Sequence, residues 1–354
     1  MNFDILINDS MENATLDEPT LFEYRQQKIC CFWDLNNNFK IDVDKFANYS
    51  LIIANSSWER SNVFNQCYQY IQEHSKNFII LTCRLDDHLK CPNLFYFPYY
   101  GYRLASSIKR SRKKINIEQN NKKYLVSCLN GSPRSHRVYN YLLLKDHRNF
   151  SDFYFTMHHD SQFESVLDLT HANLDVINHT QLSTEHVQQW LESRLQFANW
   201  ENQNRNTSIL PNQYNQMATD HDVYNPAYSD SYINLVTETV IDNHTFITEK
   251  TWKPVASGQL FLIIGYQGII SDLRKHGVDT FDDIINHDYY DNEPDWQLRI
   301  HKIHKVLNNL LEQDLEQLNQ QTLDRRKSNA EKFINGDFFQ SYLTDIISCI
   351  NSLN

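Results

Sequence analysis

The chain has 354 residues, of which 41% are hydrophobic and 22% charged, so it is long enough for two domains with ordinary apolar cores. Its net charge of −11 argues against a protein whose whole surface binds nucleic acid, and its 7 glycines and 8 prolines exclude a collagen-like or linker-dominated chain. No run of about 18 apolar residues is present. Residues 1–19 carry acids where a signal peptide would carry bases, so the sequence predicts a cytoplasmic protein without membrane insertion.

The first part of the chain alternates apolar runs with one amphipathic segment. Four apolar runs predict strands: residues 28–33, 50–56, 77–83 and 93–101. A helix is predicted from Ser61 to His74, where apolar positions recur at helical spacing. We expect Pro98 and Gly101 to end the fourth strand. Strand, helix and strand at this spacing predict a parallel α/β layer.

The seven cysteines form no C-x-x-C pair, and several lie in apolar runs. This pattern predicts buried free thiols in a reducing compartment. They are Cys30, Cys31, Cys67, Cys83, Cys91, Cys128 and Cys349.

Residues 106–123 interrupt the pattern with a polar, basic stretch that has no periodicity. We place the domain boundary here, with an N-terminal acceptor-side domain at 1–108, a linker at 109–122 and a C-terminal domain at 123–354. The favoured interpretation is a solvated linker, and the alternative is a surface for the phosphates of DNA, RNA or an anionic glycan. Its cations are Lys109, Arg110, Arg112, Lys113, Lys114, Lys122 and Lys123.

A second α/β series follows. Strands are predicted at residues 123–130, 152–160, 231–240 and 259–265. Helices are predicted from Pro133 to about 145, over 184–195, 248–257 and 268–277, and from about Asp295 onward. The fold class is therefore α/β, with two Rossmann-like domains facing a cleft and with C-terminal helices, the last of which can return to the first domain.

The stretch from 231 to 277 carries the clearest chemical pattern. Thr248 is an expected helix N-cap, and Glu249 and Lys250 occupy the first turn. A helix N-terminus presents free N–H groups that bind phosphate, and a lysine adds a full positive charge. A glutamate there is able to accept both ribose hydroxyls. The alternative is a capped amphipathic helix with a solvated Glu–Lys pair.

The run FITEKTWKPVASGQLFLIIG, preceded by YINLVTET, resembles the donor-binding region of GT-B glycosyltransferases. It is closest to the alpha-1,3-fucosyltransferase family, with a looser likeness to phage DNA glucosyltransferases. The resemblance covers roughly residues 231–285. It implies that Glu249 binds the donor ribose, that Lys250 binds the pyrophosphate and that Glu238 touches the donor sugar or ribose.

A second candidate donor contact lies in SCLNGSPRSHRVYNYLL, where a strand ends at Asn130 and a helix follows. Arg134 and Arg137 lie three residues apart, on one helical face. Two guanidinium groups at the end of a strand suit a diphosphate, and the resemblance also implies a basic pyrophosphate contact here. The alternative is a pair of surface arginines in ordinary ion pairs.

An inverting transferase needs a carboxylate that takes the proton of the acceptor hydroxyl. Glu59 and Asp86, each after a predicted strand, are the candidate catalytic bases, and a solvated loop acid is the alternative for both. Neighbouring aromatic residues are expected to form either a sugar-stacking wall or part of the core: Trp58, Tyr96, Tyr99, Tyr100 and Tyr102.

No metal or other cofactor is expected. The D-x-D patterns Asp42–Asp44 and Asp220–Asp222 are short enough to arise by chance, and neither clearly follows a strand of a nucleotide-binding fold. The run His158, His159 and Asp160 has no obvious further ligands.

Together these patterns predict a glycosyltransferase that moves a sugar from a nucleotide-sugar donor to the hydroxyl of a glycan or another acceptor, by a metal-independent and inverting reaction. One alternative is a DNA-base glycosyltransferase acting on modified DNA. Another is a non-catalytic module of the same fold that binds a glycan or nucleic acid. The donor sugar, the acceptor, the stereochemical outcome and the oligomeric state are left open.

Overall fold

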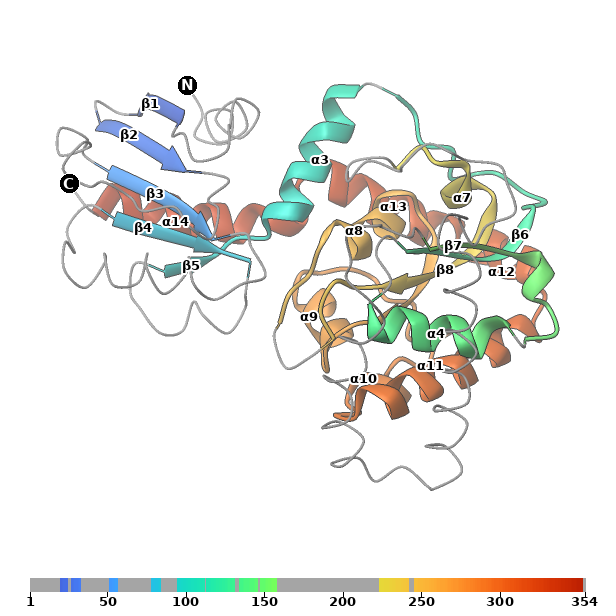
Figure 1. Ribbon diagram of the computed structural model, residues 1–354. Coiled ribbons are helices and arrows are strands. Elements are labelled where there is room, and N and C mark those ends of the chain that lie inside the picture. The colour runs from blue at the N-terminus through green and yellow to red at the C-terminus, as the bar shows by residue number, and fades with distance from the viewer. Residues whose placement is uncertain are drawn as a thin grey trace, which may run out of the picture.

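The computed structural model describes residues 20–24, 27–32, 51–56, 78–83, 94–111, 113–130, 134–145, 147–157, 223–241 and 245–352. Over these residues the chain is an α/β protein built on two β-sheets (Figure 1). The helices predicted at 61–74 and 184–195 lie outside the described residues.

The first sheet has the strand order β1-β2-β3-β4-β5. Its strands are β1 (Thr20–Tyr24), β2 (Gln27–Phe32), β3 (Leu51–Ser56), β4 (Phe78–Thr82) and β5 (Leu94–Tyr96). β1 runs antiparallel to β2, and every later pair is parallel. Ile29, Ile79 and Leu81 are fully buried, as expected for apolar strands covered on both faces. The strands predicted at 28–33, 50–56 and 77–83 are confirmed.

The prediction of one strand over 93–101 is wrong beyond Tyr96. β5 ends there, and helix α3 (Tyr99–Ser111) begins directly after Pro98, whose carbonyl accepts a hydrogen bond from Tyr102 N (2.9 Å). Gly101 lies inside this helix, where a Cβ would come within 2.8 Å of both Trp252 and Phe339. It therefore serves close helix packing rather than strand termination.

The predicted basic linker overlaps the end of α3. The first residues assigned to it, 109–111, form the last turn of α3, where the cations of Lys109 and Arg110 complement the helix dipole. Lys122 is half-buried and donates to the Ser229 carbonyl (2.7 Å), and Lys123 lies over the Tyr124 ring (4.9 Å). The segment thus combines a helix end with residues anchored to the second sheet.

The second sheet has the order β7-β6-β8-β9, and all its strand pairs are parallel. Its strands are β6 (Tyr124–Asn130), β7 (Phe153–Met157), β8 (Ser231–Thr237) and β9 (Leu260–Ile264). The four strands predicted for this part of the sequence are confirmed. The next strand in the chain, β7, lies on one side of β6, and β8 lies on the other side. The strand order therefore reverses between β6 and β8.

Helices cover both faces of this sheet. α4 and α11 lie on one face, and α3, α8 and α13 lie on the other (Figure 1). The helical elements after α3 are α4 (Ser135–Lys145), η3 (Phe150–Asp152), α7 (Pro226–Ser229), α8 (Glu249–Ala256), α9 (Ile269–Lys275), α10 (Asp288–Asp291), α11 (Trp296–Leu311), α12 (Leu315–Gln321), α13 (Leu323–Asn335), η4 (Asp337–Phe339) and α14 (Gln340–Ser352).

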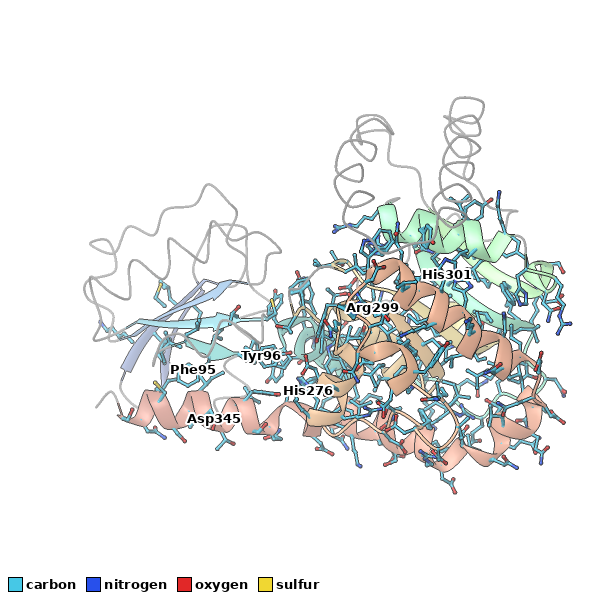
Figure 2. All side chains as sticks on the ribbon, turned by 90° about the horizontal axis from the view of Figure 1, so that it is seen from below. Phe95, Tyr96, His276, Arg299, His301 and Asp345 are labelled. Carbon is cyan, nitrogen blue, oxygen red and sulfur yellow. The ribbon has the colours of Figure 1, made fainter. Side chains whose placement is uncertain are left out.

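The last helix returns to the first sheet, as expected. α14 runs along this sheet and contacts β5, although its residues fall within the range assigned to the second domain (Figure 1). Tyr96 of β5 packs edge-on against Tyr342 of α14, with ring centroids 4.9 Å apart, and against His276 at 5.7 Å (Figure 2). An aromatic cluster therefore joins the two parts of the molecule.

Among the described cysteines, Cys30, Cys31, Cys83 and Cys128 are buried free thiols and Cys349 is a half-buried one. No helix within the described residues is both long enough and apolar enough to cross a membrane.

Candidate functional site

The carboxyl ends of β6, β7 and β8 are linked by hydrogen bonds between their last residues. The Thr237 hydroxyl donates to the Asn130 side-chain carbonyl (2.5 Å), and Asn130 N donates to the Thr156 hydroxyl (3.0 Å). All three side chains are buried. This edge lies where the strand order reverses, which is the place where open α/β sheets bind their ligands.

Glu238 follows β8 directly and is fully buried (0% exposed). Its carboxylate accepts hydrogen bonds from the Thr239 backbone N–H (3.0 Å), from the Thr248 N–H (3.1 Å) and hydroxyl (2.6 Å), and from the Thr251 hydroxyl (2.6 Å). These four donors satisfy a buried carboxylate that would otherwise be costly to desolvate. Glu238 therefore ties the end of β8 to the first turn of α8.

The start of α8 has the local structure that its sequence predicts. Thr248 is extended (φ −102°, ψ −179°), and its hydroxyl oxygen accepts a hydrogen bond from Lys250 N (3.3 Å), as an N-cap does. The Lys250 ammonium pairs with the Glu249 carboxylate at 2.5 Å. The Lys250 side chain is 27% exposed, whereas that of Glu249 is 6% exposed.

Burial alone raises the pKa of Glu249, but the nearby Lys250 ammonium and its hydrogen bond outweigh burial and lower it. Glu249 is therefore a carboxylate at neutral pH. The first turn of α8 combines the positive end of a helix dipole, a reachable ammonium and a fixed carboxylate. This set is able to bind an anion and a hydroxyl-bearing group side by side.

The start of α4 holds the backbone after β8 from the other side. Arg134, just before the helix, donates to the Thr239 carbonyl (2.6 Å). His136 Nε2 donates to the Glu238 carbonyl (2.8 Å), and Arg137 donates to the same carbonyl (3.3 Å). The two predicted arginines thus lie together at the carboxyl edge of the sheet, in contact with backbone oxygens there.

A third arginine, Arg299 of α11, joins this edge. It is buried and donates to the carbonyls of Ile241 (3.1 Å) and Gly265 (3.1 Å), in the segments after β8 and β9. It also donates to the nearer carbonyls of Glu293 and Pro294. Sequence reasoning missed it because all these partners are backbone groups, which no side-chain pattern marks.

The charges of the three guanidinium groups all act on the His136 imidazole. Burial, followed by the charges of Arg137, Arg134 and Arg299, lowers the pKa of His136 to about 3, so the imidazole is neutral. Burial and Arg134 lower the pKa of Arg137 to about 10, against the opposing effect of the Glu238 and Glu249 carboxylates. Glu249 of α8 and Arg137 of α4 therefore act on one another across the edge.

Several predicted site residues lie outside the described residues. These are the candidate bases Glu59 and Asp86, together with Trp58, Asp42, Asp44, His158, His159, Asp160, Asp220 and Asp222. Of the proposed sugar-stacking wall, Tyr96, Tyr99 and Tyr102 are core residues, and Tyr100 packs edge-on against Phe246 (5.6 Å). Within the described ranges, no group of three or more His, Cys, Asp or Glu side chains is placed to hold a metal ion.

No protein family, no curated protein and no solved structure matches the chain.

Proposed function

We propose that the chain is a GT-B-like glycosyltransferase, with two Rossmann-like domains, that transfers a sugar from a nucleotide donor to an acceptor hydroxyl. The donor diphosphate lies at the carboxyl edge of the second sheet, between the starts of α4 and α8. The reaction needs no metal and inverts the anomeric centre. The sugar-transfer chemistry is inferred from the resemblance of residues 231–285 to the alpha-1,3-fucosyltransferases.

The observation that carries the proposal is the meeting of two helix starts at the point where the strand order reverses. α4 brings Arg134 and Arg137 there, and α8 brings Glu249 and Lys250. Arg299 lies at the same edge, where the carboxylates of Asp291, Asp295 and Glu293 act on it. A group of cations beside a helix N-terminus favours a diphosphate over a neutral ligand.

The proposed reaction forms a bond between the acceptor oxygen and the anomeric carbon, and it breaks the bond from that carbon to the diphosphate. The electron pair of the broken bond leaves with the diphosphate, whose negative charge is stabilised by Lys250 and by the positive end of the α8 dipole. In this reaction, Glu249 holds the ribose hydroxyls. Glu238 positions α8, and its direct contact with the donor stays a prediction. Glu59 or Asp86 takes the acceptor proton.

A thermal-shift panel of nucleoside diphosphates and nucleotide sugars tests the donor site. A ligand that binds only the folded protein raises the melting temperature by mass action, by RT ln(1 + [L]/Kd) in free energy. We expect one nucleotide class to stabilise the wild type and to lose most of its effect in Lys250→Ala. Lys275→Ala is the matched control, because it also removes a lysine from an ion pair (with Asp272, 2.7 Å), but on the exposed end of α9.

Two outcomes count against the proposal. The first is a folded wild type that no nucleotide stabilises, which favours a binding module on this fold. The second is an equal shift in the wild type and Lys250→Ala, which moves the anion site away from α8. Hydrolysis or transfer of the stabilising nucleotide sugar then separates an enzyme from a binding module.

A further inference from the structure

A surface cavity of about 510 Å³ lies against α10 and α11, on residues that take no part in the donor site. Its size falls in the range of about 300–1,000 Å³ that small-molecule sites occupy. The apolar side chains of Ile284, Val306 and Leu310 contribute to its lining. The remaining lining residues are polar or aromatic: Asn286, Tyr289, Lys305, Asn308, Asn309 and Gln313.

Tyr289 is the aromatic wall of this cavity, and it is held in place although it is exposed. Its side chain is 41% exposed, which is unusual for a large hydrophobic residue in the described part of this chain. The Lys302 ammonium lies over the ring, 5.5 Å from its centroid, and pairs with Glu293 at 2.6 Å. A cation–π contact and an ion pair thus fix an exposed ring.

The polar lining is dominated by uncharged groups. Amides both donate and accept hydrogen bonds, as sugar hydroxyl groups do. Two of them already have partners, because the Asn308 side-chain oxygen accepts from His147 (3.0 Å) and the Gln313 amide donates to the Asn309 carbonyl (3.3 Å). Among the described residues that line the cavity, Lys305 is the one charged side chain, and none is a carboxylate. A phosphate or polyanion site would need more cations, and a hydrophobic ligand would leave the amides without partners.

We propose that this cavity binds a short neutral oligosaccharide. The apolar face of one sugar ring stacks on Tyr289, and its hydroxyl groups exchange hydrogen bonds with Asn286, Asn309 and Gln313. The site holds a saccharide independently of any transfer reaction, so it does not depend on the proposed donor site. It would hold the chain on a glycan while another part of the molecule acts.

Calorimetric titration of the whole protein with maltotriose, cellotriose and chitotriose, and with inorganic pyrophosphate as the anionic probe, tests this site. We expect at least one of the three neutral sugars to bind the wild type. Tyr289→Ala should weaken this binding about tenfold or more, because the stacking surface is lost. Tyr289→Phe keeps the ring and should bind nearly as well as the wild type. Because Tyr289 is exposed, we expect neither variant to change the melting temperature. A thermal melt of the same samples measures it.

Asn309→Ala is a second test, since it removes an amide and leaves the ring intact. We expect it to weaken the same sugar and to leave pyrophosphate unaffected. The proposal is overturned if none of the three sugars binds, or if the sugar binds Tyr289→Ala as tightly as the wild type. Tyr289-dependent binding of pyrophosphate alone would identify an anion site instead. Pyrophosphate bound at the proposed donor site would bind Tyr289→Ala and Asn309→Ala as it binds the wild type, so failure of the donor site and failure of this site are distinguishable.

Discussion

Glu238 accepts two hydrogen bonds from Thr248, one from its backbone N–H (3.1 Å) and one from its hydroxyl (2.6 Å). The Thr248 hydroxyl oxygen in turn accepts from Lys250 N (3.3 Å). The cap of α8 is therefore itself held by a buried carboxylate. The position of the proposed diphosphate site depends on the contact between Glu238 and Thr248.

Glu238→Ala should destabilise the fold strongly. The variant leaves four buried donors without their acceptor, and we expect the free energy of unfolding to fall by about 3–5 kcal/mol. Urea denaturation followed by circular dichroism measures the change. Glu118→Gln is the control, because it alters only an exposed ion pair with Lys327, which solvent screens, so its effect should be far smaller. Equal losses in the two variants would contradict a special role for the buried carboxylate.

Thr251→Val should lower the free energy of unfolding by less than Glu238→Ala does. It keeps the side-chain shape and removes one donor to Glu238 (2.6 Å), so we expect a loss of about 1–2 kcal/mol in the free energy of unfolding. Thr344→Val, on the exposed side of α14, removes only a hydroxyl that donates to the Gln340 carbonyl (2.9 Å). Chemical denaturation of both variants should therefore separate them. If Thr251→Val is as stable as Thr344→Val, the hydroxyl does not support the carboxylate.

The stability of the fold should fall as the pH drops below about 6.5. Burial is the main cause that lowers the pKa of His136 and His304 to about 3 and that of His287 to about 4, whereas an unfolded histidine titrates near 6.5. Between these values the unfolded chain binds more protons, so protonation favours unfolding. Each histidine then contributes a slope of about 1.4 kcal/mol per pH unit.

Urea denaturation at pH 7, 6 and 5 measures that slope. His304→Gln should reduce it by about one histidine's share, about 1.4 kcal/mol per pH unit. His304 Nε2 donates to the Asn140 side-chain carbonyl (2.9 Å), so the variant also loses some stability at pH 7. The slope, rather than the absolute value, is the test. An unchanged slope in His304→Gln would show that this histidine does not resist protonation in the folded state.

Gly101→Ala should destabilise the junction of α3 with α8 and η4. The added methyl group would lie 2.8 Å from both Trp252 and Phe339, and such overpacking costs about 1–3 kcal/mol. Alanine is the better helix former and recovers about 1 kcal/mol, so we expect a net loss of up to about 2 kcal/mol in the free energy of unfolding. Ser107→Ala, on the same helix, is the control. Comparison of the two melting temperatures checks the prediction, and a gain in both would show that the junction is loosely packed.

The parts of the fold that local sequence determines were predictable. The strands of the second sheet are buried apolar runs, and the α8 cap depends on Thr248 and its two successors. Glu238, by contrast, receives donors from 10 and 13 residues away, and Arg299 reaches carbonyls 34 and 58 residues away. Local patterns in a single sequence do not reveal hydrogen bonds between residues so far apart along the chain. The strand predicted over 93–101 failed because its aromatic residues favour strands, whereas Pro98 and the packing at Gly101 favour a helix start.

The return of α14 to the first sheet has a consequence for biosynthesis. Leu343, Ile346 and Ile350 are buried on α14, and Tyr342 packs against Tyr96 of β5. Translation at about 5–20 residues per second separates those two tyrosines by tens of seconds. During that interval the nascent first sheet lacks the helix that covers it. Its apolar strands must then stay shielded by other means, which makes this stretch of synthesis the stage at which a chaperone would help most.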